Sequence, residues 1–420
     1  MSSSRSVIVI GGGIVGLCTA HSLARAGCAV TVVERNAEGA DSCAHGSAGY
    51  VSPSHVAPLS APGMVWQGLK WMTSSRSPFY IQPRLDADLI RWGWLFARHC
   101  TPAHRDRAAP VLARLCLEAR ALFVALAAET GNSFALRTEG LLNLCQTQEC
   151  LDHEEHGLAR LANTVGVEAR VLDAQQTAAL EPGVRMQVAG SVYFPIDAHL
   201  TPRQLVPDLI ALLQRAGVVF RWGTAITGWR TEGGRIAAVA TDRGELQADD
   251  YVLATGSWAP DTVRGLGIRL PMQPGKGYSL TLERPRFRLT KSLILTERRV
   301  AVTPMGERLR FGGTMELSGH DGRVRPERLE QIVAAAQAYF PDFTAADFAG
   351  VQPWFGYRPV SPDGLPYVGR FARHPNLVAA CGHAMLGVTL APVTGELVAE
   401  ILTGRAPSID LTLLNPDRFA

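Results

Sequence analysis

The stretch that decides the fold is Val7-Ile8-Val9-Ile10-Gly11-Gly12-Gly13-Ile14-Val15-Gly16, close to the N-terminus. Its four leading apolar residues predict a buried parallel strand. Gly11, Gly13 and Gly16 follow in GxGxxG spacing, and residues 14–26 predict a helix that ends at Gly27. Residues 29–33 predict a second strand, which places Glu34 at the carboxyl end of that strand.

A strand before the glycines, a helix after them and an acid about 20 residues on are the context of a dinucleotide site. Gly11 permits the tight turn, Gly13 lets the backbone approach a pyrophosphate, and Gly16 lets the helix pack on the strand. The helix N-terminus offers N–H groups to phosphates. Glu34 can accept hydrogen bonds from ribose hydroxyls and would repel a 2′-phosphate, which disfavours NADP.

A second apolar strand, 251–256, ends in Ala-Thr-Gly and is followed by Ser257 and Trp258. A loop of this kind can approach the same dinucleotide from another side. Two glycine-bearing contacts on distant segments favour a long, buried FAD over an exchanging NAD, although spacing alone leaves both open.

Composition excludes several classes of protein. The chain has 420 residues, enough for two or three domains, and 47% of them are hydrophobic against 19% charged, which is a core-forming composition. A net charge of +3 gives no large basic field, so we expect no nucleic-acid partner. Eight scattered cysteines form no CxxC pair and no His/Cys cluster has zinc spacing, so we predict free thiols and no metal. No signal peptide or transmembrane segment is predicted, and we expect a cytoplasmic protein.

The rest of the chain alternates between helical and strand patterns. Apolar periodicity predicts helices within 60–130 and near 151–166, 204–215, 326–340 and 393–402. Short apolar runs predict strands at 218–220 and 225–229, a hairpin of 235–241 with 246–248, and several strands within 277–314. We predict an α/β fold: a discontinuous Rossmann-type FAD-binding domain (1–85, 196–268 and 348–420) interleaved with an α+β substrate domain (86–195 and 269–347).

Five stretches besides residues 7–34 carry a resemblance to a known family. They are 47–53 (Ser-Ala-Gly-Tyr-Val-Ser-Pro), 253–258, 276–280 (Lys-Gly-Tyr-Ser-Leu), 356–364 (Gly-Tyr-Arg-Pro to Pro-Asp-Gly) and 382–389. In this order and spacing they resemble the D-amino-acid oxidase/dehydrogenase superfamily of flavin enzymes, which implies a D-amino-acid oxidase-like fold. They are most similar to bacterial FAD-dependent D-amino-acid dehydrogenases of the small-subunit type. Residues 49–55 resemble the D-hydroxyproline dehydrogenases, which oxidise 4-hydroxy-D-proline.

The resemblance implies FAD as cofactor and assigns residues to it. The ADP half and the nucleotide would be held by Gly11, Gly13, Ile14, Val15, Gly16, Glu34, Arg35, Ile226, Ala254, Thr255, Gly256 and Trp258. The isoalloxazine ring would lie along Ser47, Ala48 and Gly49. Backbone N–H groups of Gly387, Val388 and Thr389 would face its N1–C2=O edge, where the reduced ring carries negative charge.

The resemblance also implies a substrate site around Arg358. A guanidinium binds a carboxylate through two parallel hydrogen bonds; the alternative is a structural arginine paired with Asp363. Tyr278 would add a hydroxyl to the same carboxylate, or be a buried strand tyrosine. His383 would shape the site or contact the substrate amine, or be a packed, satisfied histidine.

Tyr50 and His55 would belong to a cap over the substrate. An amino acid with a neutral amine can pass its Cα hydrogen as hydride to flavin N5, so no strong protein base, triad or metal set is required. Two residues depart from the glycine-type oxidases: Ala301 replaces a tyrosine and Met385 an arginine. A less charged pocket favours D-proline or 4-hydroxy-D-proline, and the departure weakens oxygen as the electron acceptor.

An aromatic and basic stretch suits a membrane surface, although the tryptophans would equally pack a helical core. It contains Trp66, Trp71, Trp92 and Trp94 among Lys70, Arg76, Arg84, Arg91 and Arg98. The family's dehydrogenases pass electrons to a membrane quinone chain, which implies a peripheral contact on the inner face of the bacterial cytoplasmic membrane. The oligomeric state stays open.

Three kinds of protein remain as hypotheses. The first is a D-amino-acid dehydrogenase that makes an imino acid and reduces a quinone or other non-oxygen acceptor. The second is a glycine- or sarcosine-type amine oxidase that makes hydrogen peroxide. The third is a non-catalytic flavoprotein subunit. An NAD-linked dehydrogenase is more distant, because it would be colourless when purified.

Overall fold

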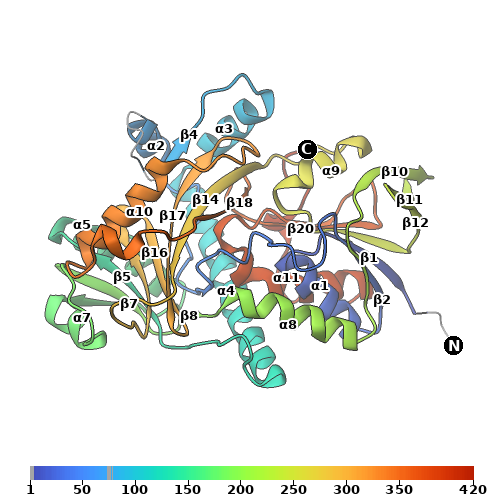
Figure 1. Cartoon of the computed structure of the whole chain (residues 1–420). Coiled ribbons are helices and arrows are strands. Elements are labelled where there is room, and N and C mark those ends of the chain that lie inside the picture. The colour runs from blue at the N-terminus through green and yellow to red at the C-terminus, as the bar shows by residue number, and fades with distance from the viewer. Residues whose placement is uncertain (1–3, 73–76, 78) are drawn as a thin grey trace.

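A six-stranded sheet forms the centre of one half of the molecule in the computed structural model, which describes residues 4–72, 77 and 79–420 (Figure 1). Its order is β19-β20-β13-β1-β2-β9, and all neighbours are parallel except β19 with β20. The strands are β1 (Ser6–Ile10), β2 (Ala29–Val33), β9 (Val219–Arg221), β13 (Asp250–Leu253), β19 (Tyr367–Arg370) and β20 (Leu377–Cys381).

Both faces of this sheet are covered, as the unbroken apolar strand β1 requires. Val7 and Val9 face a core shared with the helices α1 (Ile14–Arg25), α4 (Pro102–Thr130), α8 (Pro202–Arg215) and α11 (Gly387–Thr403). Ile8 and Ile10 face α9 (Ala259–Val263) and an antiparallel sheet of β10 (Ile226–Glu232), β11 (Arg235–Thr241) and β12 (Gly244–Leu246). Gly395 lets α11 approach α1, because a Cβ there would lie 2.5 Å from the carbonyl oxygen of Cys18.

The other half is built on a nine-stranded mixed sheet in the order β18-β14-β17-β16-β15-β5-β7-β6, with β4 paired to β17. Its strands are β4 (Phe79–Ile81), β5 (Leu141–Cys145), β6 (Arg170–Asp173), β7 (Gly190–Phe194), β14 (Gln273–Leu282), β15 (Ser292–Leu295), β16 (Val300–Met305), β17 (Arg308–Leu317) and β18 (Trp354–Val360). One face packs on α10 (Pro326–Tyr339), and Ile332, Tyr339 and Phe311 are fully buried in that core.

The remaining elements connect and flank the two halves. A two-stranded ladder joins β3 (Tyr50–Val51) to β8 (Ala198–His199). The helices α2 (Met64–Met72) and α3 (Ala87–His99) flank β4, and α5 (Gln148–Glu154), α6 (Arg160–Thr164) and α7 (Ala174–Leu180) lie near β5 to β7 (Figure 1). A π-helical stretch, Glu155–Ala159, separates α5 from α6.

The predicted elements are largely present, and the main differences are as follows. The helix predicted near 151–166 is divided by the π-helical stretch Glu155–Ala159. The region 60–130 contains the strand β4 between its helices. The second arm of the hairpin is Gly244–Leu246, because Thr241 pairs with Gly244 across a two-residue turn. The strand predicted at 251–256 ends at Leu253 and continues as a 3₁₀ turn, Gly256–Trp258. The last helix begins at Gly387, ahead of Pro392, which the buried helix accommodates.

The predicted domain boundaries stay a prediction, but hydrogen bonding and packing put three segments in the other half. Strand β4 lies in the predicted FAD-binding segment 1–85, yet it pairs with β17 in the nine-stranded sheet. Strand β18 lies in the predicted FAD-binding segment 348–420, yet it pairs with β14 in the nine-stranded sheet. Helix α4 lies in the predicted substrate segment 86–195, yet its apolar face belongs to the same core as β1 and α11. All three exchanges come from contacts between residues far apart in sequence.

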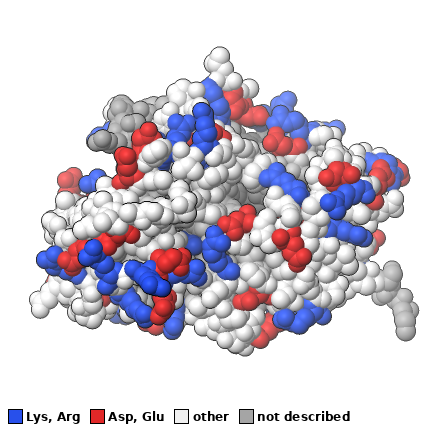
Figure 2. Space-filling model, viewed as in Figure 1, with Lys and Arg blue, Asp and Glu red and all other residues white. Residues whose placement is uncertain are grey.

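One helical segment, Ala384–Thr403, is long and apolar enough to cross a membrane by length and composition. Because 67% of it is buried inside the fold, against α1 and α4, it is a core helix here. The face of the molecule in Figure 2 mixes basic and acidic side chains, as the near-balanced composition predicts.

Candidate active site

One cavity of about 1180 Å³ is lined by both halves of the molecule and by the loop that follows β2. This volume exceeds the roughly 300–1,000 Å³ of most small-molecule sites. Every site residue predicted from the sequence lines it except Gly16, whose tight packing supports the turn from behind. The structure therefore brings the predicted cofactor and substrate residues together, while their individual contacts stay predictions.

The glycine turn has the shape that a pyrophosphate needs. Gly11 has a positive φ of 112°, and a Cβ there would lie 2.5 Å from the Ala254 carbonyl oxygen. A Cβ on Gly16 would lie 1.9 Å from the Gly11 oxygen, so the helix could not approach. A Cβ on Gly13 meets nothing within 4 Å, because this position faces the cavity. The N-terminus of α1 is thus open to a phosphate.

Glu34 is held by backbone and side-chain donors at the edge of the same turn. Its carboxylate accepts hydrogen bonds from Gly12 N at 2.7 Å and from Asn36 N and Nδ2 at 2.9 and 2.8 Å. The two oxygens keep free lone pairs, and the residue lines the cavity beside Ile226. Glu34 is therefore oriented for ribose hydroxyls.

Trp258 lies between two partners, one of which sequence reasoning missed. The Arg35 guanidinium lies 3.9 Å from the ring centre, and the His320 ring stacks at 4.5 Å with its plane tilted by only 9°. His320 also shares a hydrogen bond of 3.1 Å with Ser257 Oγ. Arg35 and His320 therefore both pack on the Trp258 ring, and Trp258 also lines the cavity. No sequence signal marked His320, which comes from a loop after β17.

The segment predicted to run beside the flavin ring is fixed by a buried arginine that sequence reasoning also missed. Arg310 on β17 donates from Nη1 to the carbonyl oxygens of His45 and Ser47, at 2.8 and 2.7 Å. Burial lowers the pKa of Arg310 to about 10, so its guanidinium stays charged at neutral pH. Gly49 turns the chain with a φ of +68°, where a Cβ would lie 2.2 Å from the Leu200 oxygen.

The first turn of α11 faces the cavity through Gly387, Val388 and Thr389. This helix of 17 residues places its positive dipole end there. Thr389 Oγ1 donates to the Tyr50 carbonyl oxygen at 2.8 Å, which ties the helix start to β3. The start of a helix suits an anionic or electron-rich edge, and contact of this turn with the flavin stays a prediction.

Arg358 projects from β18 toward the cavity and crosses β14 at Gly277. A Cβ on Gly277 would lie 2.3 Å from the Arg358 Nη1, so only glycine leaves room for the guanidinium. Nη1 donates to the Thr314 carbonyl oxygen at 2.8 Å. Asp363 instead forms two hydrogen bonds with Arg418, at 2.7 and 2.9 Å. No carboxylate among residues 4–72, 77 and 79–420 forms an ion pair with Arg358, and the alternative that paired it with Asp363 is wrong.

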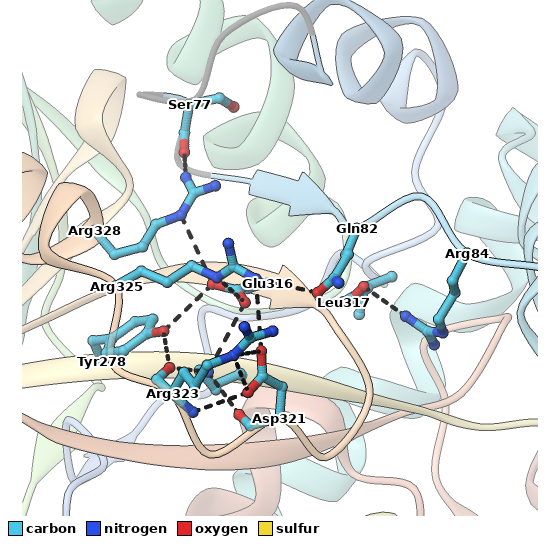
Figure 3. Close-up of polar contacts among 11 residues, drawn as sticks. Ser77, Gln82, Arg84, Tyr278, Glu316, Leu317, Asp321, Arg323, Arg325 and Arg328 are labelled. Atoms are coloured by element: carbon cyan, nitrogen blue, oxygen red, sulfur yellow. Dashed lines mark hydrogen bonds and ion pairs between the residues drawn. The ribbon is translucent and has the colours of Figure 1, made fainter.

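Tyr278 does not support the substrate role predicted for it. Residues alternate across β14, so Tyr278 faces away from Gly277 and Arg358. Its hydroxyl lies 3.4 Å from Glu316 Oε2 and 3.4 Å from the Arg323 carbonyl oxygen, within a buried ionic cluster (Figure 3). The hydroxyl is therefore committed to structure, which is the alternative that the sequence left open.

Two further predicted substrate contacts are committed elsewhere. The Tyr50 hydroxyl donates to the Leu293 carbonyl oxygen at 2.6 Å, so it joins β3 to β15 instead of capping a substrate. His383 Nε2 and Thr394 Oγ1 share a hydrogen bond of 2.9 Å, and burial lowers the pKa of His383 to about 3. His383 is a packed, neutral histidine in the cavity wall. His55 also lines the cavity, and its Nε2 forms no hydrogen bond with any described residue.

The residues present fit FAD. The open Gly13 position, the free start of α1, the oriented Glu34 and the start of α11 lie along one cavity. A site of this kind belongs to the flavin-dependent oxidoreductases.

Comparison with known proteins agrees. Residues 6–401 match the family model described as DAO, FAD dependent oxidoreductase, and the chain belongs to this family. It is 36% identical over 423 residues to a D-amino acid dehydrogenase of Granulibacter bethesdensis, covering 99% of each chain. It is 38% identical over 420 residues to that of Methylobacterium radiotolerans, covering 99% of each. Its fold is similar to glycine oxidase from Geobacillus kaustophilus, with a TM-score of 0.78, 23% identity, and 99% and 100% of the two chains covered.

Proposed function

We propose that the protein oxidises a D-amino acid to an imino acid and passes the electrons to a quinone or another non-oxygen acceptor. The observation that carries this proposal is Arg358, a cation that faces the FAD cavity and forms no ion pair with a described carboxylate. A guanidinium in this setting selects a ligand with a carboxylate. The names of the relatives supply the D-amino acid class.

Bound FAD supplies the acceptor for the hydrogen on the substrate Cα, taken as hydride. The protein positions the substrate and provides fixed charges and dipoles around it. Arg358 holds the carboxylate, and Gly277 keeps space for it. The first turn of α11 directs N–H groups into the cavity, and Arg310 fixes the loop at Ser47. Fixed dipoles of this kind stabilise developing charge without reorganising.

A cyclic, weakly polar substrate is the finer part of the proposal: D-proline or 4-hydroxy-D-proline. Ala301 and Met385 both line the cavity, where glycine-type oxidases place a tyrosine and an arginine. Ile294 and Phe355 add further apolar wall. The resemblance of residues 49–55 to hydroxyproline-oxidising enzymes supports the same class.

Contact with a membrane surface is proposed for the α2–α3 region, on the inner face of the cytoplasmic membrane. Trp66, Ile90 and Trp94 are 76%, 65% and 57% exposed. The Arg98 guanidinium lies 4.7 Å from the Trp94 ring centre. Trp92 is buried and donates to the Val360 carbonyl oxygen, so it belongs to the core. The Trp71 side chain and Arg76 lie outside the described residues.

The decisive experiment is anaerobic mixing of the purified flavoprotein with D-proline, 4-hydroxy-D-proline, D-alanine and their L-forms. We expect D-cyclic acids to bleach the flavin band near about 450 nm, with slow recovery in air. Rapid recovery with stoichiometric hydrogen peroxide would favour an amine oxidase. A yellow protein that none of these acids bleaches would contradict the proposed substrate class.

Membrane contact has a separate test. Sedimentation with vesicles that contain anionic lipid should retain the wild-type chain, and the double variant Trp66→Ser, Trp94→Ser should lose most of this binding. Equal sedimentation of both would contradict the contact.

A further inference from the structure

Three side chains form a row that runs inward from the cavity wall at the loop that follows β3, and two of them, Ser54 and His55, belong to that wall. His55 lines the cavity. Its Nδ1 lies 3.4 Å from Ser54 Oγ, and Ser54 Oγ donates to Asp197 Oδ2 at 2.5 Å. The Ser54 backbone N–H also donates to Asp197 Oδ1 at 3.0 Å. The row leads from the cavity to a carboxyl group that no solvent reaches.

His55 is arranged to pass a proton without retaining it. Burial lowers the pKa of His55 to about 4, so the ring is neutral at neutral pH. With Nδ1–H donating to Ser54 Oγ, the lone pair lies on Nε2, which forms no hydrogen bond with any described residue. The ring of Tyr50 is a neighbour of His55, with its centre 6.3 Å away.

Asp197 is arranged to receive that proton. Burial raises the pKa of Asp197 to about 7, against the two hydrogen bonds from Ser54 that favour its charged form. The groups that face it are Arg120 and Cys116 on α4 and Tyr50 on β3. Arg120 favours the ionised carboxyl, and burial holds the pKa values of the other two above their usual range. A carboxyl group poised in this way exchanges a proton near neutral pH.

The proposed reaction creates the need for such a group. An amino acid arrives with an ammonium group, and amines lose that proton only near pH 8 to 10. Hydride leaves Cα only when the nitrogen carries a lone pair to form the imine. Arg358 neutralises the carboxylate and provides no lone pair, so the ammonium proton needs another acceptor.

We propose that His55, Ser54 and Asp197 form a proton relay that deprotonates the substrate ammonium group; this rests on the proposed function. The ammonium proton moves to His55 Nε2, the Nδ1 proton moves to Ser54 Oγ, and the Ser54 hydroxyl proton moves to Asp197 Oδ2. The products are a neutral amine, the other His55 tautomer and a neutral carboxyl group. The reverse steps return the proton to the cavity after the imine leaves. His55 is the catalytic residue, while Ser54 and Asp197 act through it.

The kinetic test removes the hydroxyl group of Ser54, which lies between His55 and Asp197. Flavin reduction is followed by anaerobic stopped-flow with D-proline and D-alanine, for wild type, Ser54→Ala and Ser54→Thr, between about pH 7 and pH 10. Ser54→Ala should slow reduction about 100-fold at pH 7. The deficit should shrink to a few-fold near pH 10, where the free amine is present in solution. Ser54→Thr keeps the hydroxyl and should restore most of the rate. A deficit that is equal at every pH would overturn the relay.

A second readout does not need turnover. The protonated Asp197 carboxyl should give an infrared C=O band in the FAD-loaded protein that disappears as pH rises through about 7 and is absent in Asp197→Asn. A spectrum with no such titrating band would overturn the role of Asp197. If neither amino acid reduces the wild-type flavin, the proposed substrate class fails, and this band still decides whether the proton store exists.

Discussion

The two faces of β14 and its neighbouring strands handle buried charge in opposite ways. On the cavity face, Arg358 lies against Gly277 and contacts a backbone carbonyl oxygen without a described carboxylate partner. On the opposite face, the fully buried Lys276 lies 3.9 Å from the fully buried Glu316. Glu316 also pairs with Arg325 at 2.9 Å (Figure 3). A cation that faces a cavity without a carboxylate partner indicates a ligand site, whereas charges that neutralise one another inside the fold indicate a structural role.

The ionic cluster should show the larger effect on stability. Glu316 is the buried anion shared by Lys276, Arg325 and Arg328. Glu316→Gln leaves those cations without it and should lower the free energy of unfolding by about 3–5 kcal/mol. Denaturant unfolding measures this. Glu232→Gln, in an exposed pair with Arg230, is the matched control and should cost less than about 1 kcal/mol. Equal losses would contradict the distinction between the faces.

The cavity face should show the larger effect on catalysis. Arg358→Lys keeps the charge and loses the paired donors, so kcat/KM for the best D-amino acid should fall about 30- to 100-fold, or roughly 2–3 kcal/mol. The flavin spectrum and stability should change little. Arg185→Lys, at an exposed arginine, is the control and should leave kcat/KM unchanged. Unchanged kinetics for Arg358→Lys would show that Arg358 does not bind the substrate carboxylate.

Gly277 offers a finer test of the same face. Gly277→Ala places a Cβ 2.3 Å from the Arg358 Nη1 and should displace the guanidinium. We expect KM to rise about 10-fold, equivalent to about 1.4 kcal/mol, with a smaller change in kcat. Gly228→Ala, at a strand glycine where the nearest atom to a Cβ is 3.9 Å away, is the control. The hypothesis fails if the two variants have the same KM.

The buried, neutral His383 in the cavity wall predicts a small dependence of the free energy of unfolding on pH. The pKa of His383 is about 3 in the fold and about 6.5 when unfolded. Between these values the unfolded chain binds one more proton, so the free energy of unfolding falls as pH drops below 6.5. The loss is about 0.7 kcal/mol at pH 6 and approaches 1.4 kcal/mol for each further unit. His55 and His199, whose pKa values burial lowers to about 4, contribute to the same slope. In urea titrations His383→Asn should therefore reduce the slope by the share of one histidine, and exposed His153→Asn should leave it unchanged.

Sequence patterns were sufficient where the structure is local. The β1 strand, the glycine turn and α1 fall at the predicted residues, because strand, turn and helix signals act within about 30 residues. Arg358 was also predicted, since its neighbours Gly356 to Pro359 form a recognisable motif. The substrate contacts predicted for the Tyr278 and Tyr50 hydroxyls were wrong, because motifs do not report which face of a strand a side chain occupies.

The residues that sequence reasoning missed act through long-range contacts. Arg310 reaches the loop at Ser47 across 263 positions, and His320 reaches Ser257 across 63. Asp197 lies 143 residues from Ser54, so no spacing rule connects them. Each pairing forms only when the two halves of the molecule assemble around the cavity.

The sequence by itself determined a dinucleotide fold and, through its resemblance to a family, a flavin enzyme with an arginine for a carboxylate. Only the tertiary structure decided which buried polar groups are committed. Asp363 pairs with Arg418, the Tyr50 hydroxyl bonds to the Leu293 carbonyl oxygen, and the Tyr278 hydroxyl lies near Glu316. Arg358 and His55 remain facing the cavity. The physical reason is that a buried polar group must find a partner, and the partners available to it are set by packing and not by neighbours in the chain.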